Sequence, residues 1–396
     1  MRIPANSGFH THWALSKKTV FLNHGSFGAC PKEVLKVQQE LRKQMEASPV
    51  QFLWRHFDGL LDISRNALAE FVKARPQDLV FTSNATSGVN AVLQSLKLRS
   101  GDALLTTDHA YNACQNVVFE AARRTGATVN VARVPFPLTN SNQILEAVLQ
   151  KVTSRTRVAM IDHVSSHTAL IFPIEKIVRA LESKGIETLV DGAHAPGMVP
   201  LDLNRLRPAF YTGNLHKWVC APKGAGFLWV REDRQNAINA PVISHGYNTP
   251  RSGYTPFQDR FDWTGTFDPT AWFSVPAAIE FIKNLLPGGF AELRRRNHAI
   301  AVQARRRLCE KLQVPAPCPE SMLGAMATLA LPAKFQGISK TARIDPEQIR
   351  LHDEFGIEVP LLRLGNPEKR WFRISAQIYN SMAQYDYLAR ALLTAF

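Results

Sequence analysis

Hydrophobic and polar positions follow two alternating patterns between residues 78 and 230. Short apolar runs, each able to form a buried strand, occupy residues 78–83, 102–108, 128–134, 157–164 and 187–194. Segments with apolar residues at helical spacing lie between them, at residues 86–96, 112–126, 142–152 and 173–185. Strands that alternate with helices in this way are typical of a parallel sheet with crossover helices. The pattern therefore predicts an α/β core with a mainly parallel central sheet.

The chain beyond residue 290 has a different order of elements. It predicts a basic helix at 292–312, helices at 345–356 and 382–395, and strands at 325–332, 357–362 and 371–378. The segment "NLLPGGF" at 284–290 predicts a hinge or a helix break. We therefore expect an N-terminal arm (1–20), a large α/β domain (21–270) and a small C-terminal α+β domain (271–396).

One lysine stands in unusual surroundings, within "AFYTGNLHKWVCAPKGAGFLWV" at 209–230. Two strand-like apolar runs flank a short centre in which Lys217 lies between His216 and Trp218. Dry surroundings lower the pKa of a lysine, and a neutral amine can attack an aldehyde. The alternative is a loop lysine whose stem covers apolar surface.

Polar groups also follow other predicted strands, where open parallel sheets bind ligands. Thr86 and Ser87 would open a helix whose free N–H groups suit a phosphate, although both residue types also cap ordinary helices. His109 and Tyr111 offer aromatic rings after the strand at 102–107.

Asp191 follows the strand at 187–190, and His194 lies three residues further on. A buried carboxylate needs a partner, and a pyridine nitrogen held protonated by it becomes an electron sink. An ordinary Asp-Gly turn is the alternative. Phosphate seat, aromatic ring, carboxylate and lysine together describe a site for pyridoxal 5'-phosphate.

The chain resembles the fold-type I pyridoxal-phosphate enzymes of the class V aminotransferase family, and within it the isopenicillin N epimerase-like members. The resemblance covers nearly the whole chain and includes "LNHGSFGACP" (22–31), "SNATSGVN" (83–90), "VDGAHAPG" (190–197), "HKWVCAPKGAGFL" (216–228), "WTGTFDP" (263–269) and "FRISAQIYN" (372–380). It implies that Lys217 forms the aldimine with the cofactor. It also implies that Asp191 pairs with the ring nitrogen, that His194 lies near the phenolic oxygen and that Tyr111 stacks on the ring.

The resemblance also assigns the remaining site residues. Asn214 and His216 join Thr86 and Ser87 around the phosphate. Thr266 would reach the phosphate of a second subunit, which implies a homodimer with shared sites. Two further residues would bind the amino-acid substrate, Arg373 at its α-carboxylate and His24 in the pocket lining.

Three reactions at the substrate's α-carbon remain open: epimerisation, transamination and β-elimination of the C–S lyase type. A persulfide-forming cysteine desulfurase is disfavoured, because no cysteine occurs between residues 355 and 375. The catalytic residues expected for any of the three are Lys217, Asp191 and Tyr111.

Composition adds a competing class. The formal charge of +14 suits an anion or nucleic-acid binder, but the positive residues are scattered and no nucleic-acid motif accompanies them. Five cysteines without a CxxC pair predict neither a disulfide framework nor a zinc site. No apolar run reaches the roughly 18 residues of a membrane span, so a cytoplasmic enzyme without a metal is expected.

Overall fold

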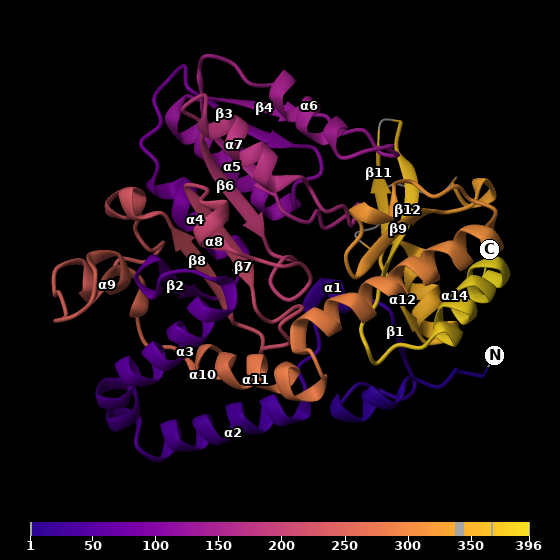
Figure 1. The fold of residues 1–396 in the computed structure, drawn as a ribbon, viewed down its shortest axis with the longest axis horizontal. Coiled ribbons are helices and arrows are strands. Elements are labelled where there is room, and N and C mark those ends of the chain that lie inside the picture. Colours follow the sequence, from indigo (N-terminus) through magenta and orange to yellow (C-terminus); the bar gives the residue numbers. More distant parts are fainter. Residues whose placement is uncertain (1, 337–343, 366, 396) are drawn as a thin grey trace.

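The structure, a computed structural model, describes residues 2–336, 344–365 and 367–395. A seven-stranded sheet lies at its centre, in the order β2–β8–β7–β6–β5–β3–β4 (Figure 1). Its strands are β2 (Leu79–Thr82), β3 (Ala103–Thr107), β4 (Thr128–Ala132), β5 (Thr156–Asp162), β6 (Glu187–Gly192), β7 (Phe210–Asn214) and β8 (Gly226–Val230). Only β8 runs antiparallel to its neighbours in this sheet. The predicted α/β core with a mainly parallel sheet is confirmed.

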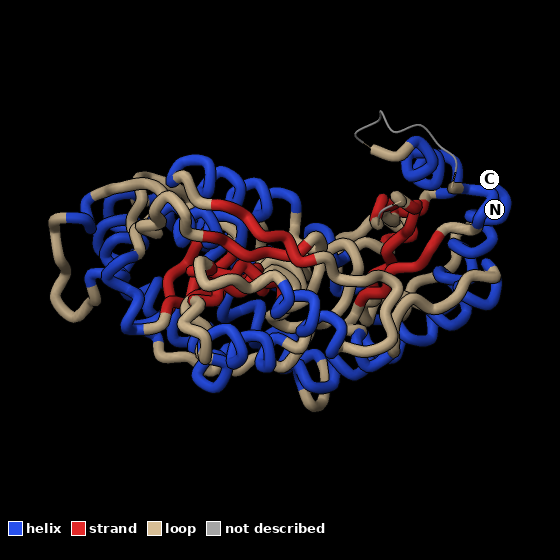
Figure 2. The backbone as a smooth tube through the Cα atoms, turned by 90° about the horizontal axis from the view of Figure 1, so that it is seen from above, coloured by secondary structure: helices blue, strands red, loops and turns tan. Residues whose placement is uncertain are grey.

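Helices cover both faces of this sheet, as the view from above shows (Figure 2). On one face lie α4 (Ala85–Ser95), α5 (Asn112–Thr125) and α9 (Pro256–Asp262); on the other lie α3 (Phe57–Val72), α6 (Asn142–Gln150), α7 (Ile174–Glu182) and α8 (Leu203–Leu206). Consecutive strand residues enter different cores: Leu104 packs in one and Leu105 in the other. Burial on both faces explains why these strands are continuous apolar runs.

A smaller unit stands beside the large sheet. It contains an antiparallel sheet in the order β11–β12–β9, formed by β9 (Met326–Ala330), β11 (Leu361–Leu364) and β12 (Lys369–Ser375). Its helices are α12 (Gly289–Leu312), α13 (Pro346–Phe355) and α14 (Met382–Ala395), and α12 packs on both α14 and β9. The predicted small α+β layer is present.

The prediction of one continuous strand at 357–362 was wrong, because this segment forms parts of two separate strands. Its first part, β10 (Ile357–Glu358), pairs in parallel with β1 (Val20–Phe21), whereas β11 starts at Leu361 and pairs with β12. Pro360 lies between them and has no N–H for a ladder. Its carbonyl instead accepts a hydrogen bond from the Arg373 backbone N–H at 3.1 Å.

The N-terminal arm lies on the small unit, so that both chain ends are found there (Figure 1). The Ser7 backbone N–H donates to the Tyr379 carbonyl at 3.0 Å, and the Ser381 hydroxyl donates to the Ala5 carbonyl at 2.7 Å. Short 3-10 turns occupy Gly8–His12, Pro76–Asp78, Glu232–Ala237, His245–Tyr247, Glu320–Met322 and Ala333–Phe335, and a π-helical turn occupies Gln51–His56.

The helices α10 (Thr270–Phe273) and α11 (Val275–Leu285) pack on α2 (Lys32–Ala47) and α3. The chain leaves these helices at the break between α11 and α12, where the sequence predicted one. The predicted domain boundary at residues 270 and 271 stays a prediction, and this packing favours a later division. Among the described residues, no helix combines the length and hydropathy needed to cross a bilayer.

Gly226, at the start of β8, controls how closely the sheet approaches α4. A Cβ at this position would lie 2.6 Å from the Asn84 Cα, and Asn84 caps α4. We expect Gly226→Ala to lower the free energy of unfolding by about 1–3 kcal/mol. Gly59→Ala is the control, because Gly59 is exposed on α3 with no atom near its Cβ position. Chemical denaturation measures both, and equal stabilities would contradict the close approach.

Candidate active site

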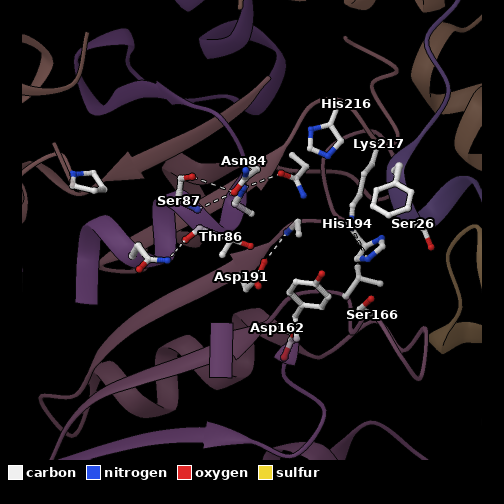
Figure 3. Close-up of a pocket in the computed structure, with 18 of the residues that line it drawn as sticks. Ser26, Asn84, Thr86, Ser87, Asp162, Ser166, Asp191, His194, His216 and Lys217 are labelled. Carbon is white, nitrogen blue, oxygen red and sulfur yellow. Dashed lines mark hydrogen bonds between the residues drawn. The ribbon is translucent and has the colours of Figure 1, made fainter. Parts of the chain in front are cut away.

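A cavity of about 590 Å³ opens at the carboxyl edge of the parallel strands. The ends of β5, β6 and β7 and the start of α4 line it (Figure 3). Eight of the residues predicted for the site line this cavity: Thr86, Ser87, Tyr111, Asp191, His194, Asn214, His216 and Lys217. From Thr86 to Lys217 they span more than a hundred residues of sequence, and the sheet brings them together.

The first turn of α4 forms one end of the cavity. The Asn84 side chain accepts a hydrogen bond from the Ser87 N–H at 2.9 Å, and the Asn214 side chain accepts from the Ala85 N–H at 2.8 Å. Thr86 and Ser87 lie beside each other here, away from the lysine (Figure 3). The N-terminus of an 11-residue helix carries partial positive charge. This end therefore fits a phosphate group.

Asp191 lies between that helix and the lysine in the close-up (Figure 3). It is 3% exposed, and its Oδ1 accepts a hydrogen bond from the Ala193 N–H at 2.9 Å. The buried Cys114, on α5, lies near it, and the Asp191 charge helps to raise the pKa of the Cys114 thiol. No basic side chain bonds to this carboxylate within the described chain, so its charge is available to a cationic ring.

Lys217 follows β7 and points into the same cavity. Its Nζ lies 3.1 Å from His194 Nε2, and His194 Nδ1 accepts a hydrogen bond from the Trp218 indole at 3.4 Å. A neutral imidazole that accepts at Nδ1 carries its proton on Nε2. That proton points at Nζ, which can accept it only as a neutral amine.

The electrostatics of the two side chains agree with this assignment. Burial, and then the Arg373 cation, lower the pKa of Lys217 to about 7, while the Asp191 charge opposes them. Burial, followed by the Lys217 charge, holds the pKa of His194 well below its usual range. Lys217 is thus a nucleophile that needs little help to lose its proton.

Two aromatic residues complete the cavity wall. Tyr111 is the N-cap residue of α5 and is 44% exposed, so one face of its ring is open. The His216 Nδ1 lies 3.2 Å from the Ala225 carbonyl oxygen, and burial lowers the pKa of His216 to about 4. His109 does not line the cavity; its Nδ1 lies 2.9 Å from the Thr168 hydroxyl.

Arg373, on β12, stands directly behind two lining serines. Its Nη1 donates to the Ser166 carbonyl at 2.6 Å, and its Nη2 donates to the Ser26 hydroxyl at 3.0 Å. Its Nε has no partner among the described residues, although the side chain is buried. The guanidinium therefore has hydrogen-bonding capacity left for a carboxylate.

The structure does not place His24 where the sequence predicted. His24, in α1 (His24–Phe27), is fully buried and is not among the cavity-lining residues. Its Nε2 donates to the Lys217 carbonyl at 2.9 Å, and the Tyr379 hydroxyl donates to its Nδ1 at 2.8 Å. His24 therefore holds the backbone of Lys217 on the side that faces the protein interior, and it does not contact the cavity.

Thr266 is exposed and lies outside the cavity of its own chain. The lining residues that the sequence did not predict include Ser26, Phe27, Asp162 and Ser166. Asp162 ends β5, so inspection of every strand end would have found it. Ser26 and Phe27 carry no such signal, because they enter the site only through the packing of α1.

We expect the neutral state of Lys217 to appear in its reactivity. In cofactor-free protein, labelling of Lys217 by an amine-directed reagent should rise as the pH increases through about 7 and then level off. Exposed lysines, with ordinary pKa values of about 10.4, should keep reacting faster at higher pH. Arg373→Met should raise the Lys217 midpoint, because one cation is removed. Peptide mass spectrometry measures each site, and a Lys217 midpoint in the ordinary lysine range would contradict the assignment.

Comparisons with known proteins agree with this site. Isopenicillin N epimerase of Amycolatopsis lactamdurans is 33% identical, over 96% of this chain and 98% of that protein. A probable chloroplastic L-cysteine desulfhydrase of Arabidopsis thaliana is 28% identical, over 94% of this chain and 82% of that protein. A solved cysteine desulfurase of Thermococcus onnurineus has the same fold, with a TM-score of 0.80 at 20% identity over 99% of this chain and 98% of that one.

The family model described as aminotransferase class V matches residues 20–388. That match spans both units of the fold and every residue of the predicted site. The predicted family is confirmed: the chain belongs to the class V aminotransferase family of pyridoxal-phosphate enzymes.

Proposed function

We propose that this protein is a pyridoxal-phosphate enzyme that acts at the α-carbon of an amino acid or an amino-acid-containing compound. The neutral Lys217 amine, held 3.1 Å from His194 in a cavity that also contains Asp191, is the observation that supports this most directly. An amine that merely covered surface would remain charged and exposed.

The cavity residues fit the cofactor at each of its chemical groups. The first turn of α4, with Thr86 and Ser87, suits the phosphate; Asp191 suits a protonated ring nitrogen; Tyr111 offers a face for stacking. When bound, pyridoxal phosphate withdraws electrons from the substrate's α-carbon. Lys217 supplies the amine that holds the cofactor and then carries a proton to or from that carbon.

The substrate carboxylate has a matching group at the other end of the cavity. Arg373 is buried behind Ser26 and Ser166, whose hydroxyls face the same space. A carboxylate that reached this position would meet a guanidinium with a free Nε and two hydroxyls. We therefore assign Arg373 to the substrate's α-carboxylate. His24 acts on the reaction indirectly, by fixing the lysine's backbone.

Epimerisation is the first candidate reaction, because the relatives named isopenicillin N epimerase are 32–33% identical over almost the whole chain. β-Elimination of the C–S lyase type is the second, because several relatives of 28–29% identity are named L-cysteine desulfhydrase. Among the described residues, no cysteine lines the cavity, which agrees with a reaction that needs no protein thiol. Transamination remains a third prediction.

The chain is proposed to work as a homodimer. Phe27 lines the cavity, yet it is 72% exposed, and the large apolar residue Trp54 is 76% exposed. A second copy would cover such apolar surface. Thr266, exposed and outside its own cavity, would then reach the phosphate seat of the partner, as the family resemblance implies. The cytoplasmic location also stays a prediction.

The covalent link to the cofactor is tested by spectroscopy. Protein incubated with pyridoxal phosphate should gain a visible absorbance band that disappears on borohydride reduction. The Lys217-containing peptide should then carry the mass of the reduced cofactor. Lys217→Ala should show neither change, and Lys223→Ala, a nearby lysine whose Nζ bonds to the Gly28 carbonyl, is the matched control. Wild type without any band after added cofactor contradicts the proposal.

The reaction type is tested with the loaded enzyme and a panel of amino acids. Inverted chirality without ammonia identifies an epimerase, sulfide with ammonia and a keto acid identifies a C–S lyase, and a keto acid that requires an acceptor identifies an aminotransferase. Arg373→Lys should raise the KM of the active substrate far more than it changes kcat, because an ammonium loses the bidentate geometry. A substrate without an α-carboxylate that reacts equally well would remove Arg373 from its assigned role.

Sharing of the site between two copies is tested at Thr266. Sedimentation should give a dimer, and Thr266→Val should weaken cofactor binding by roughly fivefold, the value of one ordinary hydrogen bond of about 1 kcal/mol. Thr128→Val is the control, because Thr128 is equally exposed but lies on the distant edge strand β4. A monomer, or unchanged binding in Thr266→Val, would argue against the shared site.

A further inference from the structure

Two buried acids lie side by side at the floor of the cavity. Asp162 ends β5, and Asp191 is its partner in the parallel register of β5 and β6. Partners in neighbouring strands point to the same face of a sheet. Each side chain is 3% exposed, and both line the cavity. Two carboxylates that were both ionised in this position would repel each other in surroundings that screen charge poorly.

The hydrogen bonds of the two acids differ. The Asp191 Oδ1 accepts a hydrogen bond from the Ala193 N–H at 2.9 Å. The Asp162 Oδ2 is buried and has no hydrogen-bond partner among the described residues. An ionised carboxylate oxygen left unpaired in the interior is costly, whereas a protonated oxygen there carries no charge.

We propose that Asp162 and Asp191 hold one proton between them and that Asp162 carries it, so that a single negative charge, on Asp191, remains at the cavity floor. Asp162 is then a positioning residue: it keeps its neighbour ionised without adding a second charge. The link between this charge and a pyridinium ring rests on the proposed function; the location of the proton does not.

The groups that face Asp162 support this assignment. Burial and then the Asp191 charge raise the pKa of Asp162 well above its usual range. From α5, Cys114 contributes a thiol whose pKa is also raised, by burial and by both acids, so it is neutral and brings no compensating positive charge. No arginine or lysine is among the groups that shift Asp162. A proton is therefore the means of compensation that the described surroundings offer.

Infrared spectroscopy can detect this proton directly. Wild-type protein at pH 8, with and without pyridoxal phosphate, should show the C=O band of a protonated carboxyl group that is lost in Asp162→Asn. Asp78→Asn is the matched control: Asp78 is 4% exposed, but Arg75 binds it through two hydrogen bonds of 2.9 Å. That control should keep the band. A band that is absent from wild type, or retained in Asp162→Asn, overturns the proposal.

The pH dependence of stability gives a second measurement. A folded-state pKa raised above the unfolded value means that the folded protein retains a proton that the unfolded chain loses, so the contribution of Asp162 to stability decreases as the pH rises from about 4. The Asp162→Asn variant lacks this titrating group. The folding equilibrium constant of the variant relative to wild type should therefore increase by up to about tenfold per pH unit across this window.

Parallel stability curves for wild type and Asp162→Asn would overturn the proposal. If Asp162→Asn does not fold, Asp162→Ser removes the same titrating group and serves in both experiments. The cofactor-free samples separate the two levels of the argument: protein that never binds pyridoxal phosphate refutes the proposed function, while the carboxyl band in the same protein still decides where the proton lies.

Discussion

The structure of the site depends on one constraint, the cost of burying the Lys217 ammonium. Because the amine is dry, it loses its proton far more readily than an exposed lysine does, and its neighbours are those that a neutral amine requires. His194 presents an N–H instead of a cation, and the Trp218 indole fixes that tautomer. The backbone is held equally firmly. Gly28 packs so closely that a Cβ there would lie 2.0 Å from the His216 carbonyl.

The topology of the sheet brings the remaining groups to this amine. β5, β6 and β7 are parallel, so Asp162, Asp191 and Asn214 end at the same edge. The lysine turn follows β7 at that edge, and the antiparallel β8 starts beside Asn214 and leads the chain away from the strand ends. The small unit closes the site from the other side, with Arg373 on β12 reaching the lining serines. Rigid strands thus fix the position of the lysine and the acids at one end, and a separate unit places a buried arginine at the other.

The sequence predicted those features that depend on local pattern. Apolar runs and helical spacing located the α/β core, and residues placed just after strands located Lys217, Asp191 and Thr86. Features that depend on distant packing were not predictable in this way. His24 faces the lysine backbone because the hydroxyl of Tyr379, 355 residues away, donates a hydrogen bond to its ring. The division at Pro360 arises because the two halves of one apolar run pair with different partners, β1 and β12. Thr266 can be placed only relative to a second chain.

Charge in the cavity follows a single rule. Dry surroundings favour the neutral form of every group that lacks an opposite partner, as at Lys217 and His194. A charge can persist only where a partner arrives with the opposite sign. Among the described residues, the Arg373 Nε has no hydrogen-bond partner and no basic side chain bonds to the Asp191 carboxylate, so each has room for such a partner. The two positions correspond to the two charges that a cofactor-bound amino acid would bring, a carboxylate and a protonated ring nitrogen. The cavity is therefore electrostatically incomplete by itself, and the positions of its two unmatched charges define the orientation in which its ligand fits.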